Sequence, residues 1–186
     1  CVESGSGCNG AQDNILDDAF TTRTYSFWFK ANDINVNAAN RQFILDEGGS
    51  TNGLSFFIQD GNLVYGAWVS SNGAWMNVSI KENTWHHAVM TLDESAKDGN
   101  TVSYYLDGVL MGSYDLNVSM ATHGGAAGIG MLHTNSKCYG ATCSPSGFYF
   151  NGTLDEFFVY DRAFGAIEVN LLYMSNFYRE DTANWT

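Results

Sequence analysis

The clearest pattern in the chain is the alternation of apolar and polar side chains in short runs. In segment 25–31, Tyr25, Phe27, Phe29 and Ala31 share one face of an extended strand, and Trp28 falls among the polar residues of the other. Because successive side chains of a strand point to opposite faces, this pattern predicts a strand with one face in a core. Similar runs lie at residues 42–45, 54–59, 63–69, 75–80, 86–92 and 102–106.

Residues that tolerate positive φ separate these runs at regular intervals. Segment 104–110, with Asp107 and Gly108 at its centre, is the clearest hairpin signal. Strands spaced this regularly, without helices between them, indicate an all-β sandwich or barrel. Further turns are predicted at 46–49, 60–62 and 71–73, and further strand-like runs at 127–132 and 148–161.

Helical spacing occurs in one segment, 166–173, which follows Gly165 and places Ile167, Leu171 and Leu172 on one side. We therefore expect one short C-terminal helix packed on the sandwich. No internal repeat, low-complexity tract or proline-rich linker divides the 186 residues. Residues 1–186 are accordingly predicted to form a single domain.

Composition and charge disfavour several classes of partner. The chain has 8 Lys+Arg against 20 Asp+Glu, and its net charge of −12 repels nucleic acids and anionic lipid surfaces but attracts cations. No apolar run approaches the roughly 18 residues of a membrane span. Because the sequence opens at Cys1 with neither methionine nor a signal sequence, we expect a processed protein or an excised domain. Scattered acidic residues are also typical of a solvated surface, which is the simpler interpretation.

The four cysteines form two local pairs, Cys1 with Cys8 and Cys138 with Cys143. Neither pair has Cys-x-x-Cys spacing or histidines placed for zinc, so disulfides fit better than a metal site. Two disulfides would place the protein in an oxidising, extracellular compartment, whereas four unpaired thiols remain the alternative.

Five segments, in order along nearly the whole chain, resemble the laminin-G-like jelly-roll family of the concanavalin A-like lectin/glucanase superfamily. They are NGAQDNI at 9–15, YSFWFK at 25–30, TWHHAVMTLD at 84–93, YLDG at 105–108 and FNGTLDEFFVYDRAF at 150–164. The resemblance implies a two-sheet antiparallel jelly-roll sandwich. The opening segment departs from the family, because a Gly/Ser-rich, Cys-containing stretch replaces the usual first strand.

Calcium is the metal that this sequence favours, since Asp and Asn oxygens are hard ligands and several must converge on one ion. By resemblance, Asp155 of the closing strand approaches the opening loop that contains Asn9, Asp13 and Asn14. A Ca²⁺ ion bound there would join the two ends of the chain. The alternative is that Asp155 only caps a turn.

Aromatic residues flanked by small polar residues are candidates for ligand contact, because a flat ring stacks on a sugar face while nearby amides supply hydrogen bonds. Trp68 and Trp75 flank the turn at 71–73, and Tyr139 and Tyr149 lie in or beside the loop closed by Cys138 and Cys143. We expect that loop to line the ligand site. An aromatic residue of a sandwich strand is, however, more often part of the core.

Catalysis is disfavoured by the motifs that the sequence contains. The strand 155–161 does not space its acids like the Glu-x-Asp-x-x-Glu pattern of laminarinase-type hydrolases, and no Gly-x-Ser-x-Gly elbow or phosphate-binding glycine loop occurs. His86 and His87 alternate within a strand and are predicted to pack, and no role is assigned to His123 or His133.

These observations predict an extracellular, calcium-supported module that binds carbohydrate or a protein or peptide epitope. We expect a monomeric module of a larger adhesin or of a secreted polysaccharide-active protein. A catalytic jelly roll of the hydrolase or lyase kind and a structural spacer of a surface protein are the alternatives.

Overall fold

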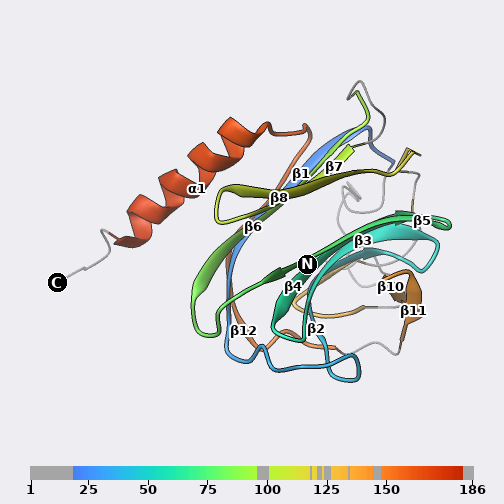
Figure 1. Cartoon of the computed structure of the whole chain (residues 1–186), viewed down its shortest axis with the longest axis horizontal. Coiled ribbons are helices and arrows are strands. Elements are labelled where there is room, and N and C mark those ends of the chain that lie inside the picture. The colour runs from blue at the N-terminus through green and yellow to red at the C-terminus, as the bar shows by residue number, and fades with distance from the viewer. Residues whose placement is uncertain are drawn as a thin grey trace, which may run out of the picture.

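A computed structural model of the chain describes residues 19–95, 101–117, 119–120, 123, 127–133, 135–144 and 148–181, with helix side chains as far as Ser175. The elements are β1 (Thr22–Ala31), β2 (Gln42–Gly48), β3 (Asn52–Gln59), β4 (Asn62–Val69), β5 (Asn72–Ser79), β6 (Trp85–Asp93), β7 (Thr101–Leu106), β8 (Val109–Asp115), β9 (Gly128–Ile129), β10 (Ser136–Cys138), β11 (Ala141–Cys143), β12 (Gly152–Tyr160) and α1 (Ala166–Asp181). One antiparallel sheet has the order β12-β1-β6-β7-β8 and the other β5-β4-β3-β2-β9, while β10 and β11 form a separate hairpin (Figure 1). The predicted two-sheet jelly-roll sandwich is confirmed.

The core lies between the two sheets and is filled by the alternate positions that the pattern predicted. Phe27 of β1 meets Phe56 of β3 edge-to-face, with ring centroids 4.9 Å apart. The hydroxyl of Tyr65 donates a hydrogen bond to the Tyr105 carbonyl at 2.6 Å, so a buried polar contact also joins the sheets. These contacts fix which face of each strand is left outside.

A buried charged cluster occupies one end of the interface between the sheets. The Glu47 carboxylate accepts a hydrogen bond from the Tyr25 hydroxyl at 2.9 Å, and Nε2 of His123 and Nη1 of Arg23 lie 2.9 Å and 3.9 Å from the same Oε1. Burial raises the pKa of Glu47, and the hydrogen bonds from His123 and Tyr25 oppose that shift. Asp46, Glu47 and Gly48 lie in β2, so the turn predicted at 46–49 is wrong at its first three positions.

The helix α1 lies against the outer face of the first sheet (Figure 1). Its N-terminus is capped by Glu168, whose Oε2 accepts from the Gly165 amide at 3.0 Å. Tyr173 stacks on Trp28 of β1 with ring centroids 5.6 Å apart. The helix continues eight residues past the predicted end at 173, because no Gly or Pro interrupts residues 166–181.

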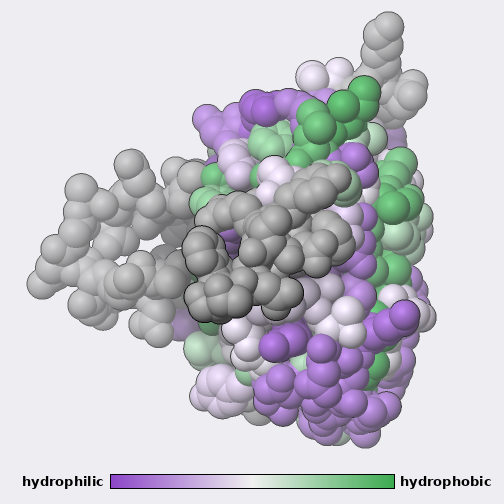
Figure 2. Space-filling model, turned by 90° about the vertical axis from the view of Figure 1, so that its left-hand side faces the viewer, coloured by the Kyte–Doolittle hydropathy of each residue, from purple (hydrophilic) through white to green (hydrophobic). Residues whose placement is uncertain are grey.

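Hydrophilic and hydrophobic residues gather on different parts of the surface. Seen from the side on which α1 ends, hydrophilic residues gather at the lower end, where the connection between β1 and β2 lies, and hydrophobic residues gather along the right flank (Figure 2). Ile167 and Leu171 of α1 are among the exposed apolar side chains. Within the described part of the chain, no helix has the length and apolar character that crossing a membrane requires.

Candidate ligand-binding site

The outer face of the second sheet presents its side chains in straight rows across β3, β4 and β5. One row runs from Ser55 through Gly66 to Trp75, because these residues pair directly in the two ladders. The next row towards the turn between β4 and β5 runs from Gly53 through Trp68 to Gly73. Glycines therefore stand beside both tryptophans, where a side chain would otherwise rise from the sheet.

Both indoles pack against this face where glycines leave room for them. A Cβ atom added to Gly66 would lie 2.7 Å from Cε3 and 2.8 Å from Cη2 of Trp75, with Cζ3 closer still. A Cβ atom at Gly53 would lie 2.9 Å from Cζ2 of Trp68. The two indoles are stacked, with centroids 5.5 Å apart and planes 5° from parallel.

The two tryptophans differ in what they offer a ligand. Trp68 is fully buried, and its Nε1 donates to the Gly49 carbonyl at 2.9 Å, so its ring supports Trp75 from the side. Trp75 is half-buried and packs against the small cluster that contains Phe57 and the disulfide. The part of Trp75 that remains in solvent is therefore held by a rigid neighbour.

Tyr139 reaches this site from the tip of the β10–β11 hairpin. The predicted disulfide between Cys138 and Cys143 is present, with a Cα–Cα distance of 5.8 Å, and both cysteines are buried against the sheet. Tyr139 is 46% exposed, and its ring centroid lies 5.9 Å from that of Trp75. The structure thus brings Trp68, Trp75 and Tyr139 together in one aromatic cluster, and the solvent-facing part formed by Trp75 and Tyr139 is the aromatic surface.

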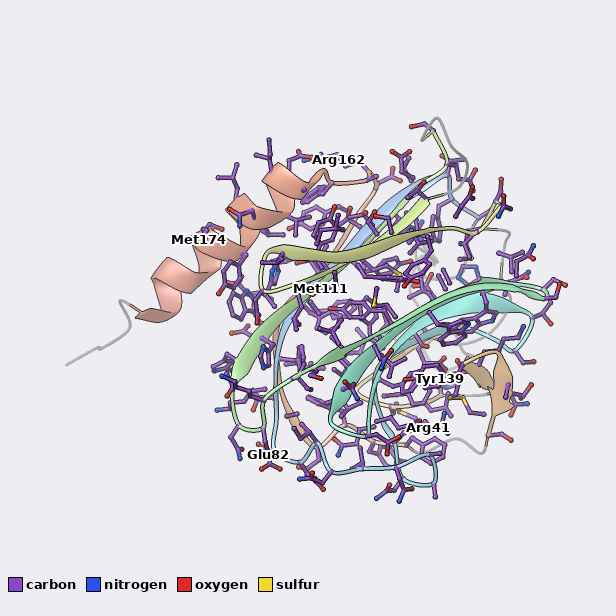
Figure 3. The ribbon with its side chains drawn as sticks, in the orientation of Figure 1. Arg41, Glu82, Met111, Tyr139, Arg162 and Met174 are labelled. Atoms are coloured by element: carbon purple, nitrogen blue, oxygen red, sulfur yellow. A yellow bond between two sulfur atoms is a disulfide. The ribbon has the colours of Figure 1, made fainter. Side chains whose placement is uncertain are left out.

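Arg41 completes the surface, and the sequence analysis did not identify it. Its guanidinium lies over the Phe57 and Phe148 rings, at 5.6 Å and 5.9 Å from their centroids, and donates two hydrogen bonds to the Ala38 carbonyl. Desolvation lowers the pKa of Arg41, and the same loss of water raises the pKa of nearby Tyr139. Figure 3 shows Arg41 and Tyr139 on the same side of the molecule, beside the second sheet.

Tyr149, the fourth predicted aromatic, lies apart from these three rings. It is 67% exposed and makes no ring contact with Trp68, Trp75 or Tyr139 in the part of the chain that the structure describes. Its neighbour Phe148 packs on Phe43 instead. A role for Tyr149 in ligand contact stays a prediction.

The predicted calcium ligands fall largely outside the described residues. Asn9, Asp13 and Asn14 lie there, as do Cys1 and Cys8 of the first predicted disulfide. Asp155 is exposed on β12 opposite Trp28, and its Oδ1 accepts from the Glu156 amide at 2.8 Å. Among the described residues, no three His, Cys, Asp or Glu side chains come together as a metal site would require. The calcium site stays a prediction.

The histidines of β6 form a structural network under α1. Nε2 of His87 lies 2.9 Å from the Ser26 hydroxyl, but the Asp107 carboxylate contacts the ring of His86, at 2.8 Å, and not that of His87. Desolvation lowers the pKa of His87 to about 4, and the negative charge of Asp107 opposes this shift. Ser26 and His87 are both buried, so this serine–histidine pair packs beneath Trp28 and Tyr173 and is closed to a substrate.

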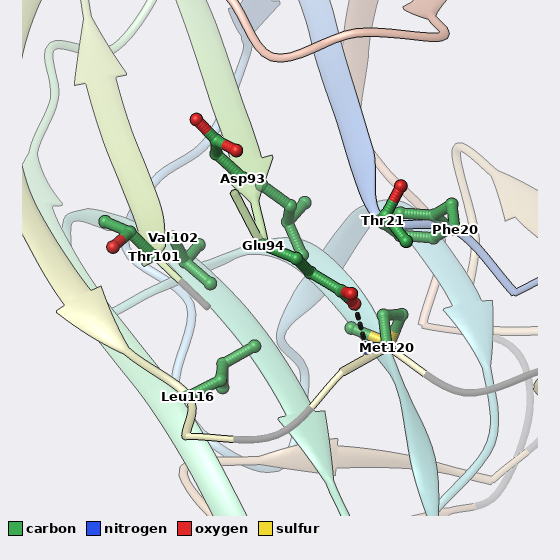
Figure 4. Close-up of a pocket in the computed structure, with 9 residues that line it drawn as sticks. Phe20, Thr21, Asp93, Glu94, Thr101, Val102, Leu116 and Met120 are labelled. Carbon is green, nitrogen blue, oxygen red and sulfur yellow. Dashed lines mark hydrogen bonds between the residues drawn. The ribbon is translucent and has the colours of Figure 1, made fainter. Parts of the chain in front are cut away.

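A small cavity lies at the end of the sandwich near Phe20, Leu116 and Met120 (Figure 4). Its volume of about 10 Å³ leaves room for about one water molecule. Glu94 at its rim accepts a hydrogen bond from the Met120 amide at 3.0 Å. The cavity is too small for an organic ligand, so the aromatic surface is the better candidate site.

Comparisons with known proteins agree with this architecture. A laminin-G family model, described as the concanavalin A-like lectin/glucanases superfamily, matches residues 9–170. A comparison with curated protein sequences finds no significant match.

Among solved structures, the chain is similar to the native heptameric SAP-like pentraxin from Limulus polyphemus, with TM-score 0.59, 18% identity and coverage of 84% of this chain and 71% of the pentraxin. It is similar to the botulinum neurotoxin type G receptor binding domain, with TM-score 0.60, 15% identity and coverage of 84% and 38%. It also resembles the binding domain of botulinum neurotoxin DC in complex with rat synaptotagmin II, with TM-score 0.61, 16% identity and coverage of 88% and 38%. The chain spans less than two fifths of the length of these two neurotoxin domains, and at such identities the likeness concerns the fold.

Proposed function

The chain belongs to the concanavalin A-like lectin/glucanase superfamily, and on this basis we propose that it is a lectin-like module that binds carbohydrate on the outer face of its second sheet. The observation that carries the proposal is the pair formed by Trp75 and Tyr139, two partly exposed rings 5.9 Å apart. Flat apolar rings stack on the C–H faces of sugars and lose little conformational entropy when they do so.

Rigidity of the pair supports binding. Trp75 rests on Gly66 and against the buried Trp68, and Tyr139 stands on a hairpin closed by a disulfide. A site that is ordered before the ligand arrives loses less free energy on binding than one that must be ordered by it. The side chain of Lys137 donates to the Ser70 carbonyl, which further ties the hairpin to the β4–β5 turn.

We also propose that the module works outside the cell and that calcium supports its fold. The Cys138–Cys143 disulfide favours an oxidising compartment. The calcium proposal rests on the acidic balance of the chain and on Asp155. The wider protein of which the module is part, an adhesin or a polysaccharide-active protein, belongs to the same proposal.

The test is a glycan and peptide array probed with the whole chain and with Trp75→Ala, Tyr139→Ala and Phe158→Ala. Phe158 is a matched control because it is 45% exposed, like Tyr139, but lies on β12 of the other sheet. Loss of one stacking contact worth about 0.5–1.5 kcal/mol predicts about two- to tenfold weaker glycan binding for the first two variants. Binding to peptides alone, hydrolysis of a glycan, or no binding at all would each contradict the proposal.

A further inference from the structure

Beyond the aromatic pair, the outer face of the second sheet has a polar end towards the β3–β4 turn. The row next to Trp75 runs through Phe57, Val64 and Asn77, and the row after it through Gln59, Asn62 and Ser79. Successive rows are roughly 7 Å apart, since each is two residues farther along the strands. Carboxamides and a hydroxyl therefore begin one row beyond the indole and continue to the β3–β4 turn.

Most of these polar groups are held by one another, and Asn77 is the one whose exposed amide is left for a ligand. The Ser79 hydroxyl donates to Asn62 Oδ1 at 3.0 Å, and Asn62 Nδ2 donates to the Asp60 carbonyl at 2.7 Å. Gln59 Nε2 donates to Asp60 Oδ2 at 2.9 Å, while its Oε1 is enclosed without a hydrogen-bond partner. The exposed amide of Asn77 makes no hydrogen bond within the described residues.

The outward side chains of β5 carry no charge, although the chain as a whole has a net charge of −12, and Asn77 and Ser79 of that strand are exposed. The hairpin buries Phe57 and Val64 beside them, so β5 is the open edge of this face. The outward positions of the three strands are Gly53, Ser55, Phe57, Gln59, Asn62, Val64, Gly66, Trp68, Gly73, Trp75, Asn77 and Ser79. Of the two cations beside the aromatic pair, Arg41 interacts electrostatically with Asp60, and Lys137 lies at the opposite end of the face, where it donates to the Ser70 carbonyl. Asp60 stands at the polar end and would repel a carboxylate or sulfate.

Resting on the proposed carbohydrate function, we infer that the ligand is an uncharged glycan chain of at least two sugar units that runs along the strands. One sugar stacks on Trp75 and Tyr139, and the next lies over the Asn77 row, where hydroxyls meet the carboxamides. Hydroxyl groups both donate and accept, and so they match amides and a serine without any ionic partner. Over the Asn77 row a charged sugar would lose its water and meet only uncharged side chains, with Asp60 beyond them.

The experiment is a calorimetric titration of the whole chain with neutral gluco-oligosaccharides of one to six units and with oligouronides of matched linkage and length. Affinity should rise from one to two or three units and then level off, and the oligouronides should bind at least tenfold more weakly. Asn77→Ala should remove the gain from the second unit, about two- to tenfold for lost hydrogen bonds, while leaving the single sugar unaffected. Asn77→Arg should improve oligouronide binding.

Asn72→Ala is the matched control, because Asn72 is an exposed asparagine of the same strand whose position faces the opposite side. Equal affinity for charged and neutral chains, or identical binding by Asn77→Ala and Asn72→Ala, would overturn the inference while Trp75→Ala still tests the proposed function. Absence of binding to every glycan would overturn both.

Discussion

The contact between Gly66 and Trp75 makes a direct test of how the site is built. In Gly66→Ala, the new Cβ would lie 2.7 Å and 2.8 Å from two atoms of the indole, distances that non-bonded carbons do not tolerate. The neighbouring backbone belongs to two ladders of the sheet and cannot yield easily, so Trp75 must lift away from the sheet. The substitution therefore displaces the Trp75 side chain without deleting it.

The magnitude follows from overpacking, which costs about 1–3 kcal/mol where a well-packed site receives an extra methyl group. For a domain of this size, each kcal/mol lowers the melting temperature by about 2–4 °C, so we expect a fall of about 2–12 °C. Ligand affinity should fall about two- to tenfold because the ring contact is lost. The circular dichroism of the stacked Trp68–Trp75 pair should weaken in the same variant.

Gly165→Ala serves as the control, since an added Cβ there would meet its nearest neighbour, Glu168 Oε2, at 4.0 Å. Thermal unfolding, near-ultraviolet dichroism and glycan titration are measured on both variants. If Gly66→Ala matched the wild type in all three, Trp75 would not rest on Gly66, and the account of a preordered platform would be refuted.

Three further predictions concern calcium, the disulfide and pH. Calcium should raise the melting temperature, because an ion that binds only the native state stabilises it; identical melting curves in calcium and in excess chelator would contradict the site at Asp155. Cys138→Ser with Cys143→Ser should weaken ligand binding more than it lowers stability, since a short closed loop contributes modestly to folding; a large fall in melting temperature with unchanged affinity would make the bridge purely structural. Because the pKa of His87 is lowered to about 4 in the fold from an unfolded value of 6.5, the folded protein should lose stability as pH falls from about 6.5 towards 4. In urea unfolding measured at several pH values, the unfolding free energy of His87→Gln should change less with pH over that range. An unchanged pH dependence would count against His87 as the cause.

The fold was predictable because alternation is a local property. Tyr25, Phe27 and Phe29 face the core as the pattern required, and regular turns indicated neighbouring antiparallel strands. The prediction failed at Asp46 and Glu47, whose acidic side chains before two glycines resemble a turn. Glu47 is kept in a buried strand by Tyr25 and His123, and no local pattern shows that residues so distant in sequence will meet it.

The site was predictable in its residue types but not in its arrangement. Small polar neighbours singled out Trp75, and the cysteine spacing singled out the loop of Tyr139, yet these residues come together only through packing of the hairpin on the sheet. Arg41 was missed because a cation before an apolar run usually marks a solvated strand end. Its place between Phe57 and Phe148 depends on segments more than a hundred residues apart.

The two outer faces of the sandwich explain why one of them is the better place for a ligand. On the first sheet, α1 covers the polar side chains, because Tyr173 stacks over Trp28 and His87. Ser26 and His87 are therefore buried. On the second sheet, the hairpin covers the middle of the face but leaves Trp75 and Tyr139 partly exposed beside the uncharged outward side chains of β5. A ligand needs groups that are both ordered and accessible. The helix makes the polar groups of the first sheet inaccessible. The disulfide-closed hairpin orders the aromatic residues of the second sheet and leaves them accessible, and this difference directs recognition to the second sheet.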